Sequence, residues 1–350
     1  MDLAERRNGI IKTEPLGFPW ATQDPFLFCV YHADTYPRGN DAFGPVPSLD
    51  GRNLGSDFVL KDGWRMYHGK SVPGFPVHPH RGFETVTVVR KGIVDHSDSL
   101  GGAGRYGKGD VQWMTAGKGI QHAEMFPLIN METPNPLELF QIWLNLPKES
   151  KFVEPHYAML WNEQIPVIST IDQHGRATRI TLIAGSLEDH MAPDPAPHSW
   201  ATLPENEVAI WYMEMDSESI WNMPTASMGA NRTLYFFDGD QILINDVSVK
   251  ANHGIHLDPL IAVQLSNGSK KSRLLLLQGK PIKEPVVNYG PFVMNTREEI
   301  QEAYRDYQES RFGGWPWSKP DQTHPRQKGR FALHPDGQEH YPDLTIYGDS

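Results

Sequence analysis

The chain has 350 residues, is 39% hydrophobic and carries a formal net charge of −11. This composition is typical of a globular protein with hydrophobic cores. The acidic balance excludes an overall positive field that would attract DNA, RNA or an anionic membrane, so we expect no direct nucleic-acid binding. Cys29 is the one cysteine, which excludes an intrachain disulfide and a cysteine-based zinc site.

Segments that would direct the chain to a membrane are also missing from the sequence. No stretch approaches the about 18 uninterrupted apolar residues that a transmembrane helix requires. The first 20 residues contain no apolar core of signal-peptide length. We therefore expect no membrane association and a cytoplasmic location.

Short candidate strands follow one another along most of the chain, with 31 glycines and 29 prolines spread among them. In one of them, Phe140, Ile142, Leu144 and Leu146 alternate as in a strand with one buried face. This succession predicts an all-β fold, a sandwich or barrel, rather than alternating strand–helix units. The expected strands are 83–89, 109–116, 137–146, 179–185, 207–215, 232–239, 240–250 and 272–279.

Composition also suggests where the chain divides. The segment 147–170 interrupts the strand rhythm with prolines and charged residues, and is the best candidate boundary. We therefore expect an N-terminal domain at 1–155 and a second domain at 156–312. The remaining segment, 313–350, is rich in Gly, Pro, His and basic residues. It is expected to form an irregular C-terminal arm, and we favour a solvated extension over a segment that caps the barrel or mediates contacts.

One helix is predicted near the end of the chain, in "NTREEIQEAYRDYQESR" (295–311). Thr296 and Glu299 have the spacing of a capping box, in which each side chain bonds the backbone of the other residue. An apolar stripe at helical spacing follows, formed by Ile300, Ala303, Tyr304 and Tyr307.

Two pairs of polar residues are candidates for metal binding. In "HPHRGFETVTVV" (78–89), His78 and His80 are two residues apart, so a strand would project both from one face. This pair alone is a weak signal, because most such pairs are structural. The segment "AGKGIQHAEMFP" (116–127) supplies a second pair with the same spacing, His122 and Glu124.

Three imidazoles and a carboxylate form a compact ligand set if these two strands are neighbours in a barrel. Such a set suits Fe(II), Mn(II), Ni(II), Cu(II) or Zn(II), whereas Ca²⁺ prefers oxygen ligands alone. Four protein ligands on an octahedral ion leave two positions for water, O2 or a chelating substrate.

Glu84 is a further candidate whose direction depends on the backbone before it. It shares the parity of His78 and His80 only if the strand continues, and a bulge at Arg81-Gly82 would turn it away. It could ligate the metal, accept a hydrogen bond from a ligand histidine, or pair with Arg81. We rank Glu84 below Glu124 as a ligand.

Other motifs are less persuasive. "GAGRYG" (102–107) matches the dinucleotide pattern G-x-G-x-x-G, but a strand-like segment follows where a helix is required, so we interpret it as a turn. Cys29 lies in no nucleophile motif, and no G-x-S-x-G is present. The remaining histidines considered are expected in surface or turn positions: His190, His198, His253 and His256.

Four blocks of the sequence resemble the pirin family, a branch of the cupin superfamily. They are "HPHRGFETVT", "GDVQWMTAGKGIQHAEM", "QIWLNLP" and "EPVVNYGPFVMNTREEI", in the order and with the spacing of the family. The resemblance implies two cupin barrels, of the double-stranded β-helix or jelly-roll type, with a short C-terminal helix. It also implies one divalent metal, commonly iron, in the N-terminal barrel and none in the C-terminal barrel.

The family's metal ligands fall on His78, His80, His122 and Glu124, the four residues that strand parity selects. The general cupin motif would place a ligand at Glu84, whereas pirins take the carboxylate from the second motif, at Glu124. The segment after residue 312 matches no family motif.

Two functions follow from the resemblance. The first is a dioxygenase of the quercetin 2,3-dioxygenase type, acting on a small aromatic chelating substrate with O2. A flavonol's 3-hydroxyl and 4-carbonyl can chelate the open metal positions, and Glu124, or a displaced Glu84, is the candidate general base. The second is a non-enzymatic regulator that binds a protein partner, such as a transcription factor, in response to the metal's redox state.

Overall fold

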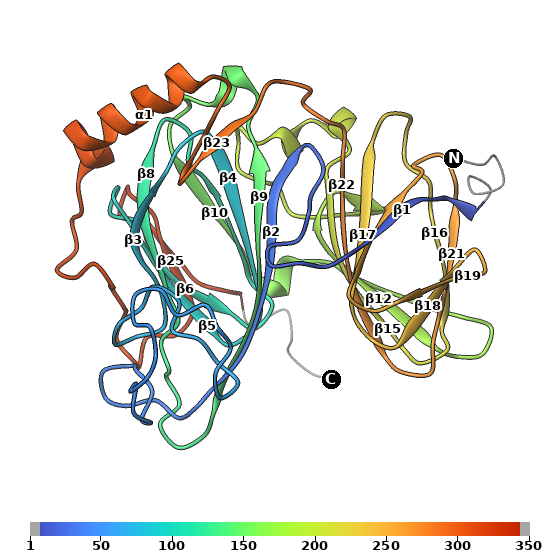
Figure 1. The fold of residues 1–350 in the computed structure, drawn as a ribbon, viewed down its shortest axis with the longest axis horizontal. Coiled ribbons are helices and arrows are strands. Elements are labelled where there is room, and N and C mark those ends of the chain that lie inside the picture. The colour runs from blue at the N-terminus through green and yellow to red at the C-terminus, as the bar shows by residue number, and fades with distance from the viewer. Residues whose placement is uncertain (1–7, 344–350) are drawn as a thin grey trace. The chain divides into compact units, whose positions relative to one another are not determined.

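The computed structural model describes residues 8–343, which form two compact units. We call one the N-terminal barrel, comprising residues 31–142, 146–163 and the described residues after 283. The other is the C-terminal barrel, comprising the described residues up to 30, with 143–145 and 164–283. Almost all regular structure is β (Figure 1), and the predicted all-β class is confirmed.

These units are not contiguous in sequence, unlike the expected division at 155 and 312. In the C-terminal barrel, β1 (Ile10–Pro15) near the start of the chain pairs with β20 (His253–Leu257). In the N-terminal barrel, the backbone N–H of Val293 donates to Arg81 O at 3.0 Å, which attaches the segment after residue 283. Pairings between residues so far apart cannot be recognised from local composition.

The N-terminal barrel contains a five-stranded sheet, β10-β7-β4-β9-β2, and a six-stranded sheet, β26-β25-β6-β5-β8-β3. A two-stranded ribbon, β23-β24, and helix α1 complete it. The bounds are β2 (Phe26–Tyr36), β3 (Gly74–His80), β4 (Phe83–Lys91), β5 (Ile93–Asp98), β6 (Ala103–Gly107), β7 (Val111–Thr115), β8 (Ile120–Met125), β9 (Asn135–Asn145), β10 (His156–Leu160), β23 (Val287–Tyr289), β24 (Phe292–Met294), α1 (Arg297–Ser310), β25 (Phe331–Leu333) and β26 (Glu339–His340).

The C-terminal barrel contains a seven-stranded sheet, β1-β20-β17-β22-β15-β12-β11, a four-stranded sheet, β16-β21-β18-β19, and a small hairpin, β13-β14. Its inward-facing side chains form an apolar core that includes Trp211, Leu234 and Phe236. The bounds are β1 (Ile10–Pro15), β11 (Val167–Ile171), β12 (Ala177–Ala184), β13 (Ser186–Leu187), β14 (His190–Met191), β15 (Ala209–Met215), β16 (Ile220–Met223), β17 (Asn231–Asp238), β18 (Gln241–Ile244), β19 (Val247–Lys250), β20 (His253–Leu257), β21 (Val263–Asn267) and β22 (Ser272–Gly279).

Most predicted strands are present, with two corrections. The single strand expected at 240–250 is the hairpin β18–β19, because Asn245 and Asp246 adopt positive φ (44° and 68°) and reverse the chain. The segment 102–107, interpreted as a turn, contains strand β6, which pairs with β5 and β25. A dinucleotide site requires a helix directly after this segment, but strand β7 follows it instead.

The predicted helix is confirmed as α1, Arg297–Ser310. The Thr296 hydroxyl accepts from Glu299 N at 3.2 Å, and Glu299 Oε2 accepts from Thr296 N at 2.9 Å, which completes the capping box. Ile300 and Ala303 are buried against Phe292 and Phe312, as the apolar stripe predicts. Among residues 8–343, no helix is long and apolar enough to cross a membrane.

The expectation of a solvated C-terminal arm is wrong for its described part, 313–343. Strand β25 pairs with β6, and Phe331 and Ala332 are buried. The Arg105 guanidinium forms a two-pronged ion pair with Asp95 (2.7 and 2.8 Å) and donates to three carbonyls of this segment, those of His324, Pro325 and Lys328. The polar composition of this segment does not reveal these contacts, because its backbone carbonyls accept the hydrogen bonds from Arg105. Residues 344–350 lie outside the described part.

A buried carboxylate in the β11–β12 turn gives a prediction on pH dependence. Burial alone would raise the pKa of Asp172, but donors from the backbone of Arg176, His174 and Ile220 and from the Arg176 side chain lower it to about 2. Since the folded pKa lies below the unfolded value, Asp172 stabilises the fold above about pH 4, and this contribution is lost as the pH falls towards 2. In urea titrations, Asp172→Asn should therefore be less stable than the wild type at pH 6, and the gap should close near pH 2. A gap independent of pH would contradict this account.

Candidate metal centre

Three histidines converge inside the N-terminal barrel. His78 and His80 lie on β3 and His122 on β8, and these antiparallel strands place His78 directly opposite His122. The ring centroids are separated by 4.5 Å (His78–His122), 4.8 Å (His78–His80) and 4.9 Å (His80–His122). One ligand nitrogen from each ring lies within 4.8 Å of the others. The structure therefore brings together the three histidines that the sequence nominated.

Close backbone approach sets this register. Gly74, at the start of β3, has φ +126°, and a Cβ at this position would lie 2.5 Å from Glu124 O. A register shift between Phe75 and His78 then adjusts the strand before the two ligand histidines. The glycine thus allows β3 to lie against the end of β8 where Glu124 is located.

The hydrogen bonds of the rings indicate which nitrogens are available. His78 Nδ1 lies 2.8 Å from Pro76 O, and His80 Nδ1 lies 3.4 Å from Pro291 O. A carbonyl oxygen only accepts, so each Nδ1 carries the proton and each Nε2 is left with its lone pair. Burial lowers the pKa of His78 to about 4 and moves the pKa values of His80 and His122 well below their usual range. The rings are therefore neutral, the form that binds a metal.

His122 gives the clearest sign that a group is accommodated here. Its side chain is fully buried, and within residues 8–343 neither Nδ1 nor Nε2 has a hydrogen-bond partner. Buried polar atoms are almost always satisfied, so an orphaned imidazole between two others fits a metal ligand. The residues present, imidazoles without thiolates, suit a first-row divalent ion, and no other cluster of at least three potential ligands was found among the described residues.

Glu124 lies beside this cluster on β8. Its Oε2 is 3.8 Å from His122 Nε2, a separation that two ligands of one ion can have. Gln141 Nε2 donates to Oε2 at 3.1 Å, while the hydroxyls of Thr87 and Tyr106 lie 2.9 and 3.4 Å from Oε1. Burial raises the pKa of Glu124 despite these donors. Ligation by Glu124 remains a prediction.

Both halves of the chain match known domains. Residues 40–144 match the Pirin family, and residues 210–313 match the Pirin C-terminal cupin domain. The chain belongs to the pirin family. The expected architecture of two cupin barrels with a short C-terminal helix is thereby confirmed.

Individual relatives agree with this family assignment. The chain is 35% identical to mouse Pirin over 261 residues, which cover 73% of this chain and 82% of the mouse protein. It is 35% identical over 241 residues to a Pseudomonas aeruginosa protein provisionally named quercetin 2,3-dioxygenase (68% and 79% coverage). A solved structure of quercetin 2,3-dioxygenase from Acinetobacter baumannii is 28% identical, with a TM-score of 0.66, covering 87% of this chain and 96% of that one.

In this pirin, Glu84 lies on a different sheet from the three clustered histidines. Gly82 has φ +84°, and a Cβ there would lie 2.1 Å from Val293 O, so the chain turns sharply after His80. Glu84 then lies on β4, opposite Thr115 of β7 in the five-stranded sheet, and accepts from the Thr115 hydroxyl at 2.7 Å. The ligand histidines lie on the six-stranded sheet, and the three-histidine cluster does not include Glu84.

His96, which is not among the site residues predicted from the sequence, is a fourth buried imidazole beside the cluster. It lies on β5 opposite Glu124, with its ring centroid 5.7 Å from that of His122. His96 Nε2 lies 3.0 Å from Asp98 Oδ2, and Nδ1 has no hydrogen-bond partner among the described residues. The available signal was the strand-spaced pair in "VDHSD", which repeats the parity of the ligand pairs.

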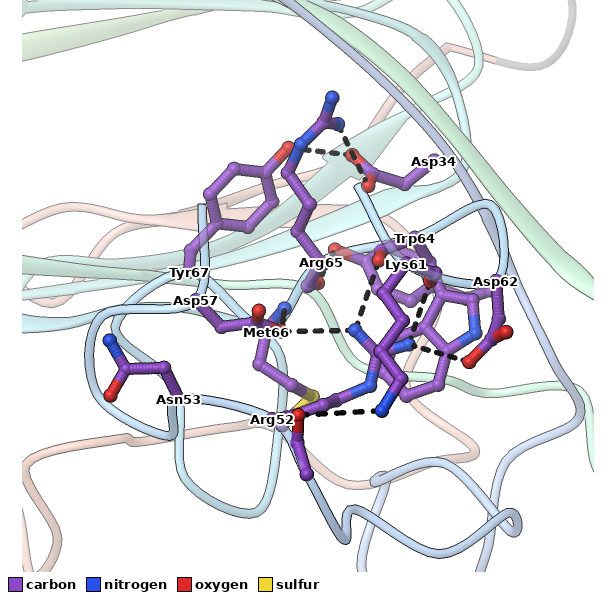
Figure 2. Close-up of polar contacts among 12 residues, drawn as sticks. Asp34, Arg52, Asn53, Asp57, Lys61, Asp62, Trp64, Arg65, Met66 and Tyr67 are labelled. Carbon is purple, nitrogen blue, oxygen red and sulfur yellow. Dashed lines mark hydrogen bonds and ion pairs between the residues drawn. The ribbon is translucent and has the colours of Figure 1, made fainter. Parts of the chain in front are cut away.

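The loop between β2 and β3 contributes Tyr67, whose ring packs on Phe75 beside His78. Figure 2 shows Asp34 accepting from the Tyr67 hydroxyl (2.6 Å) and from Arg65 (3.1 Å). The Tyr67 ring packs on Phe75 with centroids 5.2 Å apart, and Phe75 lies 6.3 Å from His78. The hydrogen bond from Tyr67 to the buried Asp34 carboxylate therefore helps to position these aromatic rings beside His78.

The remaining histidines differ in part from expectation. His190 and His198 are exposed, as predicted. His253 and His256 lie in strand β20 and not in a turn. His256 is 9% exposed, and its Nε2 lies 2.7 Å from Glu14 Oε1, so it has a structural partner within the C-terminal barrel.

Proposed function

We propose that this protein is a metal-dependent dioxygenase that cleaves flavonols such as quercetin, with His78, His80, His122 and Glu124 as metal ligands. The observation that carries the proposal is the buried histidine cluster with its orphaned His122. The structural similarity to a quercetin 2,3-dioxygenase at 28% identity supports the reaction class. Iron is the metal we expect, with Mn, Ni, Cu or Zn as alternatives, and the C-terminal barrel is expected to bind none.

The chemistry assigned to each residue follows from its surroundings. A divalent ion held here would supply a Lewis acid that acidifies a chelating hydroxyl and a centre that holds the substrate beside O2. Glu124 is the candidate base that accepts the proton of the flavonol's 3-hydroxyl. Gln141 donates to Oε2 of its carboxylate and Thr87 to Oε1, and these two hydrogen bonds hold the carboxylate in place. Phe75 offers an aromatic surface next to His78 for a planar substrate.

Elemental analysis followed by a turnover assay tests this proposal. We expect purified protein to contain about one transition-metal ion per chain, and Fe(II)-loaded protein to consume one O2 for each quercetin lost. Glu124→Gln should reduce turnover by about 10²–10⁴-fold, the usual contribution of a general base. The matched control is Glu138→Gln, since Glu138 is also buried but faces Lys91.

Metal-loaded protein without quercetin turnover would reject the dioxygenase. It would leave the second function expected from the sequence, a metal-responsive regulator that binds a protein partner. Full activity and unchanged metal content in Glu124→Gln would instead reject the roles assigned to Glu124.

A further inference from the structure

The C-terminal barrel contains a buried arginine that the proposed metal chemistry does not use. Arg232 lies near the start of β17 and is 1% exposed. It shares strand parity with Leu234 and Phe236, whose side chains belong to the barrel core, so its side chain points to the barrel interior. A buried guanidinium at such a position normally has a carboxylate or several carbonyls around it.

Two of the three guanidinium nitrogens of Arg232 lack such partners among the described residues. Nε and Nη1 are buried, and neither has a hydrogen-bond partner among residues 8–343. Burial lowers the pKa of Arg232 to about 10, so the side chain remains charged at neutral pH. Glu207 influences it electrostatically but makes no hydrogen bond to it in the described structure. A buried cation with unsatisfied donors and only a shared carboxylate nearby is costly, which indicates that a further group carrying negative charge belongs beside it.

Gln278 adds an unsatisfied acceptor at the same place. It is the direct cross-strand partner of Arg232 on β22, and it is 7% exposed. Its Nε2 donates to Glu207 O at 3.4 Å, while the buried Oε1 has no partner among the described residues. The amide oxygen and the guanidinium do not satisfy each other although they are neighbours. A group that accepts from arginine and donates to an amide oxygen would satisfy both.

The charge of the surroundings favours an anion. Lys280 Nζ lies 3.8 Å from Glu207 Oε1, so one carboxylate serves two cations, Arg232 and Lys280. Glu207 and Lys280 are about a quarter and a third exposed, which places this end of the cluster next to solvent.

We propose that Arg232 and Gln278 form a binding site for a small oxyanion that also bears an O–H group. A 2-hydroxycarboxylate and hydrogen phosphate share this chemistry: an anionic oxygen accepts from Arg232, and a hydroxyl donates to Gln278 Oε1. The site lies in the barrel for which the sequence predicts no metal, and it is independent of the proposed dioxygenase activity.

Thermal unfolding of the full chain at constant ionic strength tests this site, with sodium glycolate, sodium acetate, sodium phosphate or sodium chloride as the probe. We expect glycolate or phosphate to raise the unfolding midpoint by on the order of 5 °C at a hundredfold excess over Kd, and chloride to have no effect. A response to glycolate above that to acetate identifies a hydroxycarboxylate site, and a response to phosphate alone identifies a phosphate site. No response to any oxyanion would overturn the proposal.

Two variants assign the effect to these residues. Arg232→Met should abolish the response without lowering the midpoint of ligand-free protein, because it removes an unpaired buried charge. Gln278→Glu places a carboxylate opposite Arg232 and should raise the ligand-free midpoint while abolishing the response, so it tests the site even if Arg232→Met fails to fold. Arg179→Met, at a half-exposed arginine of the same barrel, is the matched control and should respond like the wild type. A response that persists in either site variant would contradict the assignment, while metal content and quercetin turnover should be unchanged in both.

Discussion

Replacing His122 by alanine is expected to abolish metal binding while leaving the barrel folded. Neither ring nitrogen of His122 has a hydrogen-bond partner among the described residues, so its removal takes away a proposed ligand without breaking a hydrogen bond there. It also leaves only His78, His80 and the proposed ligand Glu124, a set with one imidazole fewer and therefore a lower affinity, from which dialysis should remove the ion. Metal content after dialysis, measured by plasma mass spectrometry, should fall from about one ion per chain to background.

The matched control for this experiment is His256→Ala, which removes a histidine that pairs with Glu14 in the C-terminal barrel. Its metal content should equal that of the wild type. The free energy of unfolding of metal-free His122→Ala should be lower by no more than about 2–4 kcal/mol, the range for truncating a large buried side chain. Retention of one ion per chain in His122→Ala would refute the assigned cluster.

Arg105→Met should have the largest effect on stability among the substitutions considered. The Arg105 guanidinium is buried, pairs with Asp95, and satisfies three carbonyls of the segment that precedes β25. Methionine preserves much of the apolar stem but leaves the fully buried Asp95 carboxylate without its cation. Breaking one side of a buried ion pair costs roughly 3–5 kcal/mol, and urea titration should show a loss of this size.

Removing both charges distinguishes the contribution of the Arg105–Asp95 ion pair to stability from that of the hydrogen bonds to the three carbonyls. The double variant Arg105→Met/Asp95→Asn should recover part of the loss, because no buried charge is then unpaired. Limited proteolysis should cut the segment after residue 313 faster in Arg105→Met than in the wild type, since its carbonyls lose their donor. Equal stability of Arg105→Met and wild type would show that the arm does not depend on this arginine.

Local periodicity accounts for the parts of the fold and site that could be predicted. Alternating apolar residues identified most strands, and the Thr296–Glu299 spacing identified the start of the one α-helix among the described residues. The two-residue spacing of His78 and His80 placed both side chains on one face, because a strand's side chains repeat every second residue. These properties depend on neighbours within a few positions, which sequence displays directly.

Glu84 shows where such periodicity fails. Its spacing from His80 matches the general cupin motif, and only the positive φ of Gly82 and the approach of Val293 send it to the other sheet. The same holds for 240–250, where two residues of positive φ divide one apparent strand into a hairpin. One or two residues of positive φ override the alternation in these cases, and the alternation pattern does not encode them.

The sequence by itself determined the all-β class, the terminal helix and the identity of three histidines that cluster, because each rests on short-range spacing. Only the tertiary structure decided that His78 faces His122, that His96 lies beside them, and that two buried nitrogens of Arg232 have no hydrogen-bond partner among residues 8–343. It also decided that the polar segment after residue 313 packs onto Arg105 and β6. These features join residues tens to hundreds of positions apart, and their energies come from burial and strand pairing that no local pattern records.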